Sequence, residues 1–549
     1  MDPFTPALFL TIGAVAVVIG SNRPFGIYGI TALVSIVAAI AVTLLLGFRL
    51  PATVVLSPWQ IENVFLNSLS LTVDKVSWFL ALLLVMTTMS LFLTGLSERL
   101  EMSSQERAVC LVVVALALLT LFSDNLITLI LALTISDIFN SLFVFVSNRK
   151  SNLPQDFARN LQIPDIVRLC TNLFSIGLLL LVALDDYTLV HTNSKTLSIG
   201  HVSILIVVAM IRLNIYPVNV RLVINDAVST VVITVISLVN IVVAVDILTS
   251  FELQNYAITF RGWLTIAAIL SGLVGGFRWC IATNHSERLY SLLLAQSGLA
   301  ILTFVWGGNW AVVGVLSHVM AIAVSAVVIY MGEGLIGSDS NSFIKPLLTG
   351  LVFGCQPLTA GFLGIFVLYS GLMSNLTWAI FVMPSMIVIN GLTILGGFRL
   401  LRLSIVDIDT QPPLVNVAKS LGVCVPLLAS VAVGLAPDKF ASLIGLPNLP
   451  GWSGLFTTSG LTSLGTSVIS ASLAIFLWYY RSKVLFVVKD LSGSSLVYVA
   501  DSQWIHLTIW RIYRRLSKSI HMLADILEGQ GGVLWALVIV FAMLVVAGG

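Results

Sequence analysis

The amino-acid sequence predicts an all-α protein that crosses a membrane many times, with about sixteen transmembrane helices. Hydrophobic residues make up 58% of the 549 residues, charged residues make up 9%, and the mean hydropathy is +1.04. Soluble globular proteins carry far more charge than this. Apolar runs long enough to cross a bilayer recur along the chain, and basic residues gather in alternate loops between them. These observations predict a polytopic membrane protein.

Composition and motifs argue against several other function classes. The formal net charge of +2 is close to neutral, so nucleic acid is not an expected partner. The five cysteines lack CxxC spacing and the six histidines form no HxxxH pattern, so we predict no metal site. No nucleotide-binding loop or nucleophile motif occurs in a suitable context, and we predict no cofactor and no catalytic residue. The first apolar run has no basic residues before it, which favours a retained span over a signal peptide.

The apolar runs define the elements in chain order. Their approximate limits are 5–21, 27–47, 76–96, 108–122, 125–146, 169–185, 201–217, 226–249, 262–283, 289–306, 310–332, 347–373, 377–400, 415–437, 464–480 and 533–547. Ser123, Asp124 and Asn125 alone separate the fourth run from the fifth, which predicts a tight turn between two antiparallel helices. The longest polar interruption, 481–532, is too short for a typical folded domain.

The basic residues predict the orientation in the membrane. Most of the 27 lysines and arginines lie in loops and span ends that follow odd-numbered spans. Because cytoplasmic loops carry an excess of basic residues, this side is predicted to be cytoplasmic and the N-terminus to lie outside. The expected location is the inner (cytoplasmic) membrane of the cell.

The cytoplasmic segment contains an amphipathic pattern over residues 505–527. Isoleucine and leucine recur there at helical spacing, and basic residues fill the other side. The basic residues are Arg511, Arg514, Arg515 and Lys518. We expect a helix that lies along the membrane surface as an anchor on anionic lipid headgroups. A strut against neighbouring subunits is the alternative.

Arg212 stands inside the apolar run 204–217, which reads ILIVVAMIRLNIYP. A charge at that depth costs at least about 2.5–3.5 kcal/mol, so it needs a partner or a water-filled cavity. Pro217 lacks a backbone donor and predicts a helix break just past the charge. A broken helix that carries a charge is a common way to build an ion or substrate site. A structural brace is an equally open interpretation.

Five short motifs occur in an order, and on spans, that match one family, and together they cover about residues 70–405. They are Ser123-Asp124-Asn125-Leu126, Arg212-Leu-Asn-Ile-Tyr-Pro217, Glu287-Arg288-Leu289-Tyr290-Ser291 with Gln296-Ser297-Gly298, Leu316-Ser317-His318, and Pro357-Leu-Thr-Ala-Gly361-Phe362. The set resembles the antiporter-like membrane subunits of respiratory complex I and their relatives in Mrp-type Na+/H+ antiporters.

The resemblance implies two five-helix repeats, inverted with respect to each other, with broken helices 7 and 12. Pro217 would break helix 7, and Pro357 and Gly361 would break helix 12. The expected divisions are 1–107 (helices 1–3), 108–249 (first repeat), 262–400 (second repeat), 415–480 (helices 14 and 15), 481–532 (cytoplasmic segment) and 533–549 (last helix).

The chain departs from the line of buried ionisable groups along which the family moves protons. Thr134 stands where the family has a glutamate, although Asp137 lies one turn further on. Arg212 replaces a lysine, and arginine stays protonated, so it can act as a fixed charge but not as a proton carrier. Ile322 or a neighbour of it stands at one later position of the line, Ile365 stands at another, and span eight has no Lys, Arg or His.

Three candidates for an ion path survive: Asp137, Arg212 and His318. We expect Asp137 and Arg212 to form a buried ion pair, because neither charge should sit unpaired in lipid. The pair is either part of an ion path or a lock between spans five and seven, in which the loss of one partner costs about 3–5 kcal/mol. For His318 the alternative is a core histidine that is hydrogen-bonded to a backbone carbonyl.

Three functions from different classes fit these patterns. The chain is a proton- or cation-coupling subunit with a depleted path, or a structural anchor whose segment 481–532 docks a partner. The third is suggested by one branch of the family, which pairs with a zinc-containing, carbonic-anhydrase-like soluble protein to accumulate inorganic carbon. In each case we expect no reaction by the chain itself, and its partners are other subunits of a membrane complex, a cytoplasmic protein among them, and the lipid bilayer.

Overall fold

The computed structural model describes most of the chain. The described residues are 2–22, 25–57, 69–95, 102–149, 155–185, 197–217, 229–251, 253–282, 284–331, 352–353, 355–403, 413–447, 449–480, 511, 514–515 and 517–519. By its internal contacts the chain divides into two units, Met1–Asp490 and Leu491–Gly549. We call the first of these unit 1.

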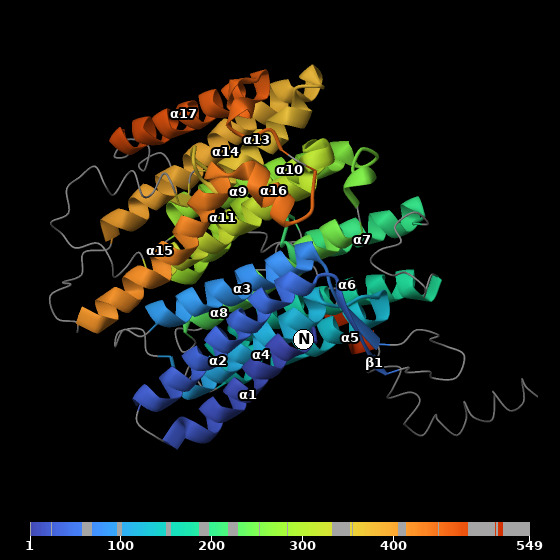
Figure 1. The fold of residues 1–549 in the computed structure, drawn as a ribbon, viewed down its shortest axis with the longest axis vertical. Coiled ribbons are helices and arrows are strands. Elements are labelled where there is room, and N and C mark those ends of the chain that lie inside the picture. The colour runs from blue at the N-terminus through green and yellow to red at the C-terminus, as the bar shows by residue number, and fades with distance from the viewer. Residues whose placement is uncertain are drawn as a thin grey trace, which may run out of the picture. The chain divides into compact units, whose positions relative to one another are not determined.

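Unit 1 is built almost entirely from helices, and Figure 1 shows its long helices lying alongside one another. They are α1 (Thr5–Ile19), α2 (Phe25–Leu46), α3 (Lys75–Thr94), α4 (Ser104–Leu121), α5 (Leu126–Arg149), α6 (Gln155–Asp185), α7 (Ile199–Arg212), α8 (Thr230–Ser250), α9 (Arg261–Ile281), α10 (His285–Trp306), α11 (Ala311–Met331), α13 (Ala360–Leu372), α14 (Leu376–Leu403), α15 (Pro413–Leu435), α16 (Pro437–Leu443) and α17 (Thr458–Tyr479). Every predicted span except 533–547 corresponds to one of these helices, and 533–547 lies outside the described residues.

The lengths of the helices agree with a multi-pass membrane protein. Within the described residues, eleven helices are long and apolar enough to cross a bilayer. Three further helices, α1, α7 and α13, are apolar but shorter, and α15 and α16 form a pair bent by 102°. Two of the short helices, α7 and α13, belong to the two spans that were predicted to be broken. The predicted fold class is confirmed.

A β-hairpin between α2 and α3 is absent from the sequence prediction. Strand β1 (Ala52–Ser57) pairs antiparallel with β2 (Leu69–Val73). The strands read ATVVLS and LSLTV, which are rich in the β-branched residues that favour extended backbone. The strands are only six and five residues long, so their pattern is weak beside the long apolar runs that predict membrane helices.

The hairpin holds the predicted tight turn between α4 and α5. In this turn Ser123 bridges to Leu71 of β2, and the backbone N–H of Asp124 donates to the carbonyl of Ser70 at 3.1 Å. The side-chain amide of Asn125 donates to Ser70 Oγ at 3.0 Å, and its oxygen accepts from the Thr128 N–H at 2.9 Å. The predicted turn is therefore confirmed. We call this end of unit 1 the hairpin end.

The first residues of α4 and α8 meet at the opposite end of unit 1. Ser103 and Glu106 form a capping box at the start of α4, and Glu106 Oε1 also accepts from the Ser229 N–H at 2.6 Å, just before α8. A carboxylate is favourable there because helix N-termini carry unsatisfied N–H groups and partial positive charge. Helices α4 and α8 therefore both run toward the hairpin end, where α8 ends at Ser250.

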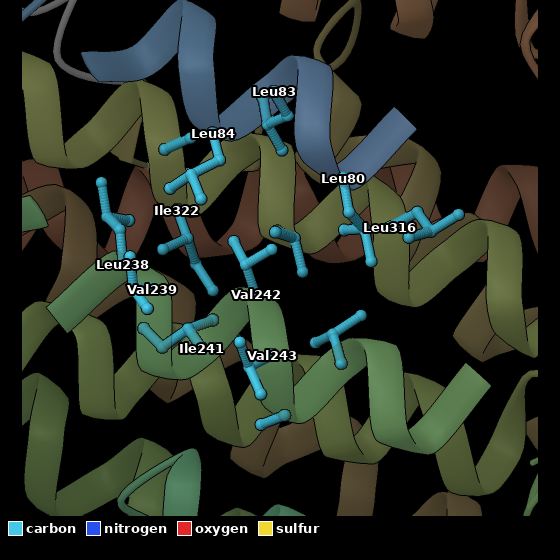
Figure 2. Close-up of a cluster of buried hydrophobic side chains, with 14 of the residues drawn as sticks. Leu80, Leu83, Leu84, Leu238, Val239, Ile241, Val242, Val243, Leu316 and Ile322 are labelled. Carbon is cyan, nitrogen blue, oxygen red and sulfur yellow. The ribbon is translucent and has the colours of Figure 1, made fainter. Parts of the chain in front are cut away.

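The core of unit 1 is aliphatic where α3, α8 and α11 meet. Figure 2 shows their side chains directed toward one another, and all are buried. We call the labelled residues the aliphatic cluster: Leu80, Leu83, Leu84, Leu238, Val239, Ile241, Val242, Val243, Leu316 and Ile322. Side chains of this kind fill space in well-defined rotamers and offer no hydrogen-bonding group.

Helices at the edge of the unit carry apolar residues on their outer sides. On α5 the exposed residues recur at helical spacing and form one stripe: Leu131, Ile135, Ile138, Leu142 and Val146. In water such a stripe would be costly, but in lipid it is the expected outer surface. Four polar residues of α5 are instead buried: Thr128, Ser136, Asp137 and Asn140.

Candidate functional site

A buried ion pair joins α5 to α7. Arg212 Nη2 lies 2.8 Å from Asp137 Oδ2, and Nη1 donates to Asp137 Oδ1 at 3.5 Å. The two side chains are 1% and 2% exposed. This forked geometry between guanidinium and carboxylate is the stronger form of ion pair. The predicted pair is confirmed, whereas its role in an ion path stays a prediction.

Asn172 of α6 is the third member of this site. Its side-chain amide donates to Asp137 Oδ1 at 3.1 Å, so Asp137 accepts hydrogen bonds from two neighbouring helices. Helices α5 and α6 are antiparallel neighbours. One turn beyond Asp137 and Asn172, toward the end where α4 and α8 begin, lie Asn140 on α5 and Arg168 on α6. Both are buried. Buried polar side chains therefore extend from the ion pair toward the end where α4 and α8 begin.

The carboxylate of this site comes from Asp137 and not from the position that the family motif indicates. Thr134 occupies that position, and its hydroxyl donates to the carbonyl of Ile130 at 2.7 Å on its own helix. A hydroxyl used in this way contributes no charge to the site. Asp137, one turn further on, supplies the carboxylate that pairs with Arg212.

Helix α7 ends at Arg212, earlier than the predicted break at Pro217. Asn214 has a φ of +54°, a left-handed conformation that asparagine tolerates better than most residues. The Tyr216 N–H then donates to Ser271 Oγ of α9 at 2.9 Å, which fixes the turn against the neighbouring helix. Arg212 is thus the last helical residue, where the partial negative charge of the helix C-terminus favours a cation.

The second predicted break lies at residues 355–359. Cys355 and Leu358 have φ values of +41° and +77°, and Pro357 lies in the turn between the helical residues 352–353 and α13. Gly361 is not part of the break, because it is the second residue of α13. A Cβ at Gly361 would lie 2.8 Å from Cys355 Sγ, so glycine there permits the close approach of the broken segment.

Polar side chains from neighbouring helices support the broken segment. Gln296 of α10 donates to the carbonyl of Phe353 at 3.4 Å, and its oxygen lies 3.9 Å from Cys355 Sγ. The N–H of Ala360 donates to Ser430 Oγ of α15 at 3.2 Å. Non-helical backbone inside a membrane protein requires such partners. Gln296 belongs to one of the five motifs, and this contact gives it a structural role.

His318 lies on α11 and is fully buried. Neither ring nitrogen has a hydrogen-bond partner among the described residues, so the bond to a backbone carbonyl that we considered is not seen. The imidazole faces α13 at Gly364, where an added Cβ would overlap Nε2 and Cδ2. Buried polar groups without partners are rare in folded proteins, so packing alone does not explain His318.

Helix α8 packs against both α7, which carries Arg212, and α11, which carries His318. The part of α8 that meets α11 and α3 contributes Leu238, Val239 and Val242 to the aliphatic cluster (Figure 2). Ile322 belongs to the same cluster, and Ile365 of α13 is also buried. The two positions that the family fills with ionisable groups are therefore packed as core.

Asp246 is a buried acidic residue that the sequence analysis did not single out. It lies on α8, one turn before the hairpin end, and is 0% exposed. One carboxyl oxygen accepts from Ser250 Oγ at 3.3 Å, and the other has no partner among the described residues. As the one charged residue in the sequence of 230–250, Asp246 was the available signal. The family pattern indicates a basic residue on this span, so no motif pointed to an aspartate.

The remaining predicted residues belong to the second unit. Arg511, Arg514, Arg515 and Lys518 are helical and exposed. Most of the surrounding segment lies outside the described residues, so the anchor on lipid headgroups stays a prediction. Among the described residues, no group of three or more His, Cys, Asp or Glu side chains could hold a metal ion.

Comparisons with known proteins give structural matches only. No protein-family model matches the chain, and no curated protein sequence matches it significantly. A chain in the structure of the Mrp complex from Dietzia sp. matches with a TM-score of 0.71 and 16% identity, over 99% of this chain and 63% of that chain. Our chain therefore spans less than two thirds of the length of that relative.

Two respiratory complexes match as well. A chain of the membrane-bound sulfane sulfur reductase, an archaeal respiratory membrane complex, gives a TM-score of 0.64 with 14% identity over 98% of this chain and 99% of that chain. A chain of respiratory complex I from Thermus thermophilus gives 0.62 with 14% identity, over 85% and 99%. At these identities the likeness shows the fold. The predicted resemblance is confirmed at that level: the chain shares the fold of membrane-protein chains in these three complexes.

Proposed function

We propose that the chain is a membrane subunit of an ion-coupled complex of the Mrp or complex I type, in which it serves as a coupling or scaffold subunit with an interrupted proton path. The fold supports the first part, because each structural neighbour is a chain of a larger complex. One observation carries the second part. The aliphatic cluster fills the space where α8 packs against α3 and α11, and α8 also packs against α7, the helix that carries Arg212.

Proton transfer across this region would need protonatable groups within one or two water molecules of each other. The leucine, isoleucine and valine side chains of the aliphatic cluster supply neither a proton nor a hydrogen bond. Arg212 adds a second obstacle, because a guanidinium holds its proton at all physiological pH values. Paired with Asp137, it offers neither a proton to pass on nor a free site to accept one. Two features therefore interrupt the proposed proton path: the aliphatic cluster, and an arginine that does not release its proton.

The Asp137–Arg212 pair has a role that does not depend on conduction. Together with Asn172 it connects α5, α6 and α7 by hydrogen bonds between buried side chains. Breaking such a pair leaves an uncompensated charge in the interior. In a coupling subunit this site responds to charge movements in neighbouring subunits, and in a scaffold it fixes the arrangement of three helices.

The arrangement in the membrane is part of the proposal. The first repeat comprises α4 to α8 and the second comprises α9 to α14; in each, the first helix packs against the last, which supports the repeats. The N-terminus lies outside the inner membrane, and the hairpin end therefore faces outward. A cytoplasmic partner binds through residues 481–532. The chain itself carries out no redox or hydrolytic reaction.

Purification of the tagged chain from native membranes in mild detergent tests the proposal. Mass spectrometry of the co-purifying proteins is expected to identify further membrane subunits of an ion-coupled complex. A single monodisperse chain without partners would contradict it. A zinc-containing, carbonic-anhydrase-like soluble partner would instead assign the chain to the inorganic-carbon alternative.

A further inference from the structure

An apolar groove runs along the outer side of unit 1 between α1, α4 and α5, and its volume is about 410 Å³. Three helices contribute the larger apolar side chains that line it: Val15, Val18, Ile19, Val109, Val112 and Phe139. None of the described residues that line the groove is charged. The groove therefore offers a ligand a contact surface but almost no hydrogen-bonding group.

Two alanines make the groove deep. Ala14 of α1 and Ala108 of α4 also line it, and they are only 3% and 6% exposed. Val15 and Ile19, by contrast, are 58% and 77% exposed. A lining residue that is almost fully covered lies deeper than one that is exposed. The alanines therefore form the floor of the groove, and the larger side chains form its rims.

The groove is closed at one end and open at the other. Helices α1 and α4 approach closely at Gly13, where an added Cβ would lie 3.6 Å from Leu111 Cδ1. The two helices are antiparallel, so the groove extends from there toward Ile19, the last residue of α1, and Gln105, the second residue of α4. Gln105 is exposed and is the one polar residue among the described lining residues. The open end thus lies where α4 begins.

The surroundings of the groove restrict what can fill it. Helix α4 is long and apolar enough to cross a bilayer, so its first two turns, which line the groove, lie at and just below the headgroup region. Water does not fill an apolar site, because it needs polar partners there. An empty groove would cost the lining atoms their dispersion contacts. The occupant is therefore an apolar group, supplied either by the lipid or by another helix.

The volume distinguishes a lipid tail from a helix. If a methylene group takes about the 30 Å³ of a water molecule, the groove holds roughly a dozen methylene groups, the size of one acyl chain. The groove follows α4 from Gln105 to Val112, a rise of about 10 Å. A helix about 10–12 Å across needs roughly 800–1,100 Å³ over that length. A helix can place side chains in the groove, but it cannot enter the groove.

We propose that this groove holds an acyl chain of a membrane phospholipid, whose headgroup lies beside Gln105 at the end of unit 1 where α4 begins. Ile138 and Leu142, which belong to the exposed apolar stripe of α5, lie next to Phe139 along that helix. The groove is therefore continuous with a surface that suits lipid. The bound tail differs from the surrounding lipid because α1, α4 and α5 contact it on three sides.

The bound tail supports the helix that carries Asp137. Asp137 pairs with Arg212 of α7, whereas Phe139, two residues further along α5, lines the groove. Helix association in a membrane depends on packing, because lipid tails are as apolar as the side chains between helices. A tail that fills the space between three helices contributes to the packing of α5 as a side chain does. This inference does not depend on the proposed function.

Photolabelling of the native full-length chain tests the inference. The chain is reconstituted with a phosphatidylethanolamine that carries a diazirine in one acyl chain, and it is then washed in lipid-free maltoside detergent before illumination. Light releases N2, and the resulting carbene inserts into nearby C–H bonds, which peptide mass mapping locates. We expect the label on the groove peptides of α1 and α4. Several-fold less label is expected at Leu142 and Val146 of α5, where detergent replaces lipid.

Two valine variants supply a matched comparison. Val109→Phe places a larger side chain in the groove, whereas Val34→Phe makes the same change at an exposed position of α2 that does not line it. Mass spectrometry of lipid extracts measures the phospholipid that each washed chain retains, and size-exclusion chromatography checks that both variants are folded. We expect Val109→Phe to lower the retained phospholipid and the groove label several-fold. Val34→Phe is expected to leave both unchanged.

Equal labelling of the groove and of the α5 stripe after washing would overturn the inference, because it would show only annular lipid. An unchanged groove label in folded Val109→Phe would overturn it as well. Benzoylphenylalanine in place of Val18 identifies the occupant in native membranes: a cross-link to phospholipid supports the proposal, and a cross-link to a protein helix rejects it. The photolabelling requires no partner subunit, so its failure is separate from a failure of the proposed function.

Discussion

Arg212 and Asp137 form a bidentate ion pair inside the helix bundle, with Nη2 at 2.8 Å from Oδ2 and Nη1 at 3.5 Å from Oδ1. They are far apart in sequence and come from the end of α7 and the middle of α5. Each is the partner that makes the other tolerable in an apolar interior. Removal of either side chain therefore leaves the other as a buried, uncompensated charge.

Arg212→Leu is expected to destabilise the protein by about 3–5 kcal/mol, because it leaves the Asp137 carboxylate buried and uncompensated. The double variant with Asp137→Leu and Arg212→Leu removes both charges and is expected to recover most of the loss. Thermal unfolding in detergent, followed by fluorescence-detected size-exclusion chromatography, measures both. Additive losses in the double variant would show that the two residues do not act as a pair.

Gly364→Ala is expected to destabilise the protein by about 1–3 kcal/mol, because the added methyl group overlaps the imidazole of His318. Adding His318→Ala makes room for that methyl group and is expected to restore stability. The matched control is Gly177→Ala on α6, where an added Cβ meets nothing within 4 Å. This change should be neutral or should stabilise the helix by up to about 1 kcal/mol. A Gly364→Ala variant as stable as the control would refute the close contact.

Deletion of Arg481 to Gln503, with the basic helix and the final span retained, is expected to release a cytoplasmic partner. The reason is that the sequence concentrates its exposed charge in this segment and the loops beside it. Co-purification of the deleted and full-length chains, compared by quantitative mass spectrometry, measures the effect. Unchanged recovery of the partner would show that it binds elsewhere.

Much of the fold was predictable because a bilayer leaves a chain few choices. Backbone polar groups must be satisfied within the segment, so apolar runs of sufficient length become helices. The free-energy cost of an unpaired charge in the membrane made the Asp137–Arg212 pair predictable as well, since the chain has few opposite charges at that depth. The Ser123–Asn125 turn followed simply from the short distance between two spans.

Features that depend on tertiary packing were not predictable in the same way. Asp246 is the one charged residue in the sequence of 230–250, but its complete burial depends on the helices that pack against α8. The end of α7 was placed at Pro217, whereas Asn214 turns the chain earlier because Ser271 of α9 is available to fix the turn. The β-hairpin was missed because its strands are stabilised by pairing with each other and with the turn at Ser123.

We expect that this chain, by itself, does not conduct protons across the membrane by the route typical of antiporter-like subunits. Proton flux into liposomes that contain the purified chain measures this directly, with an internal pH-sensitive dye and an imposed potassium diffusion potential. The expected flux equals that of empty liposomes, for the native chain and for His318→Ala alike. Flux well above that of empty liposomes, abolished by His318→Ala, would contradict it and show that protons pass the aliphatic cluster.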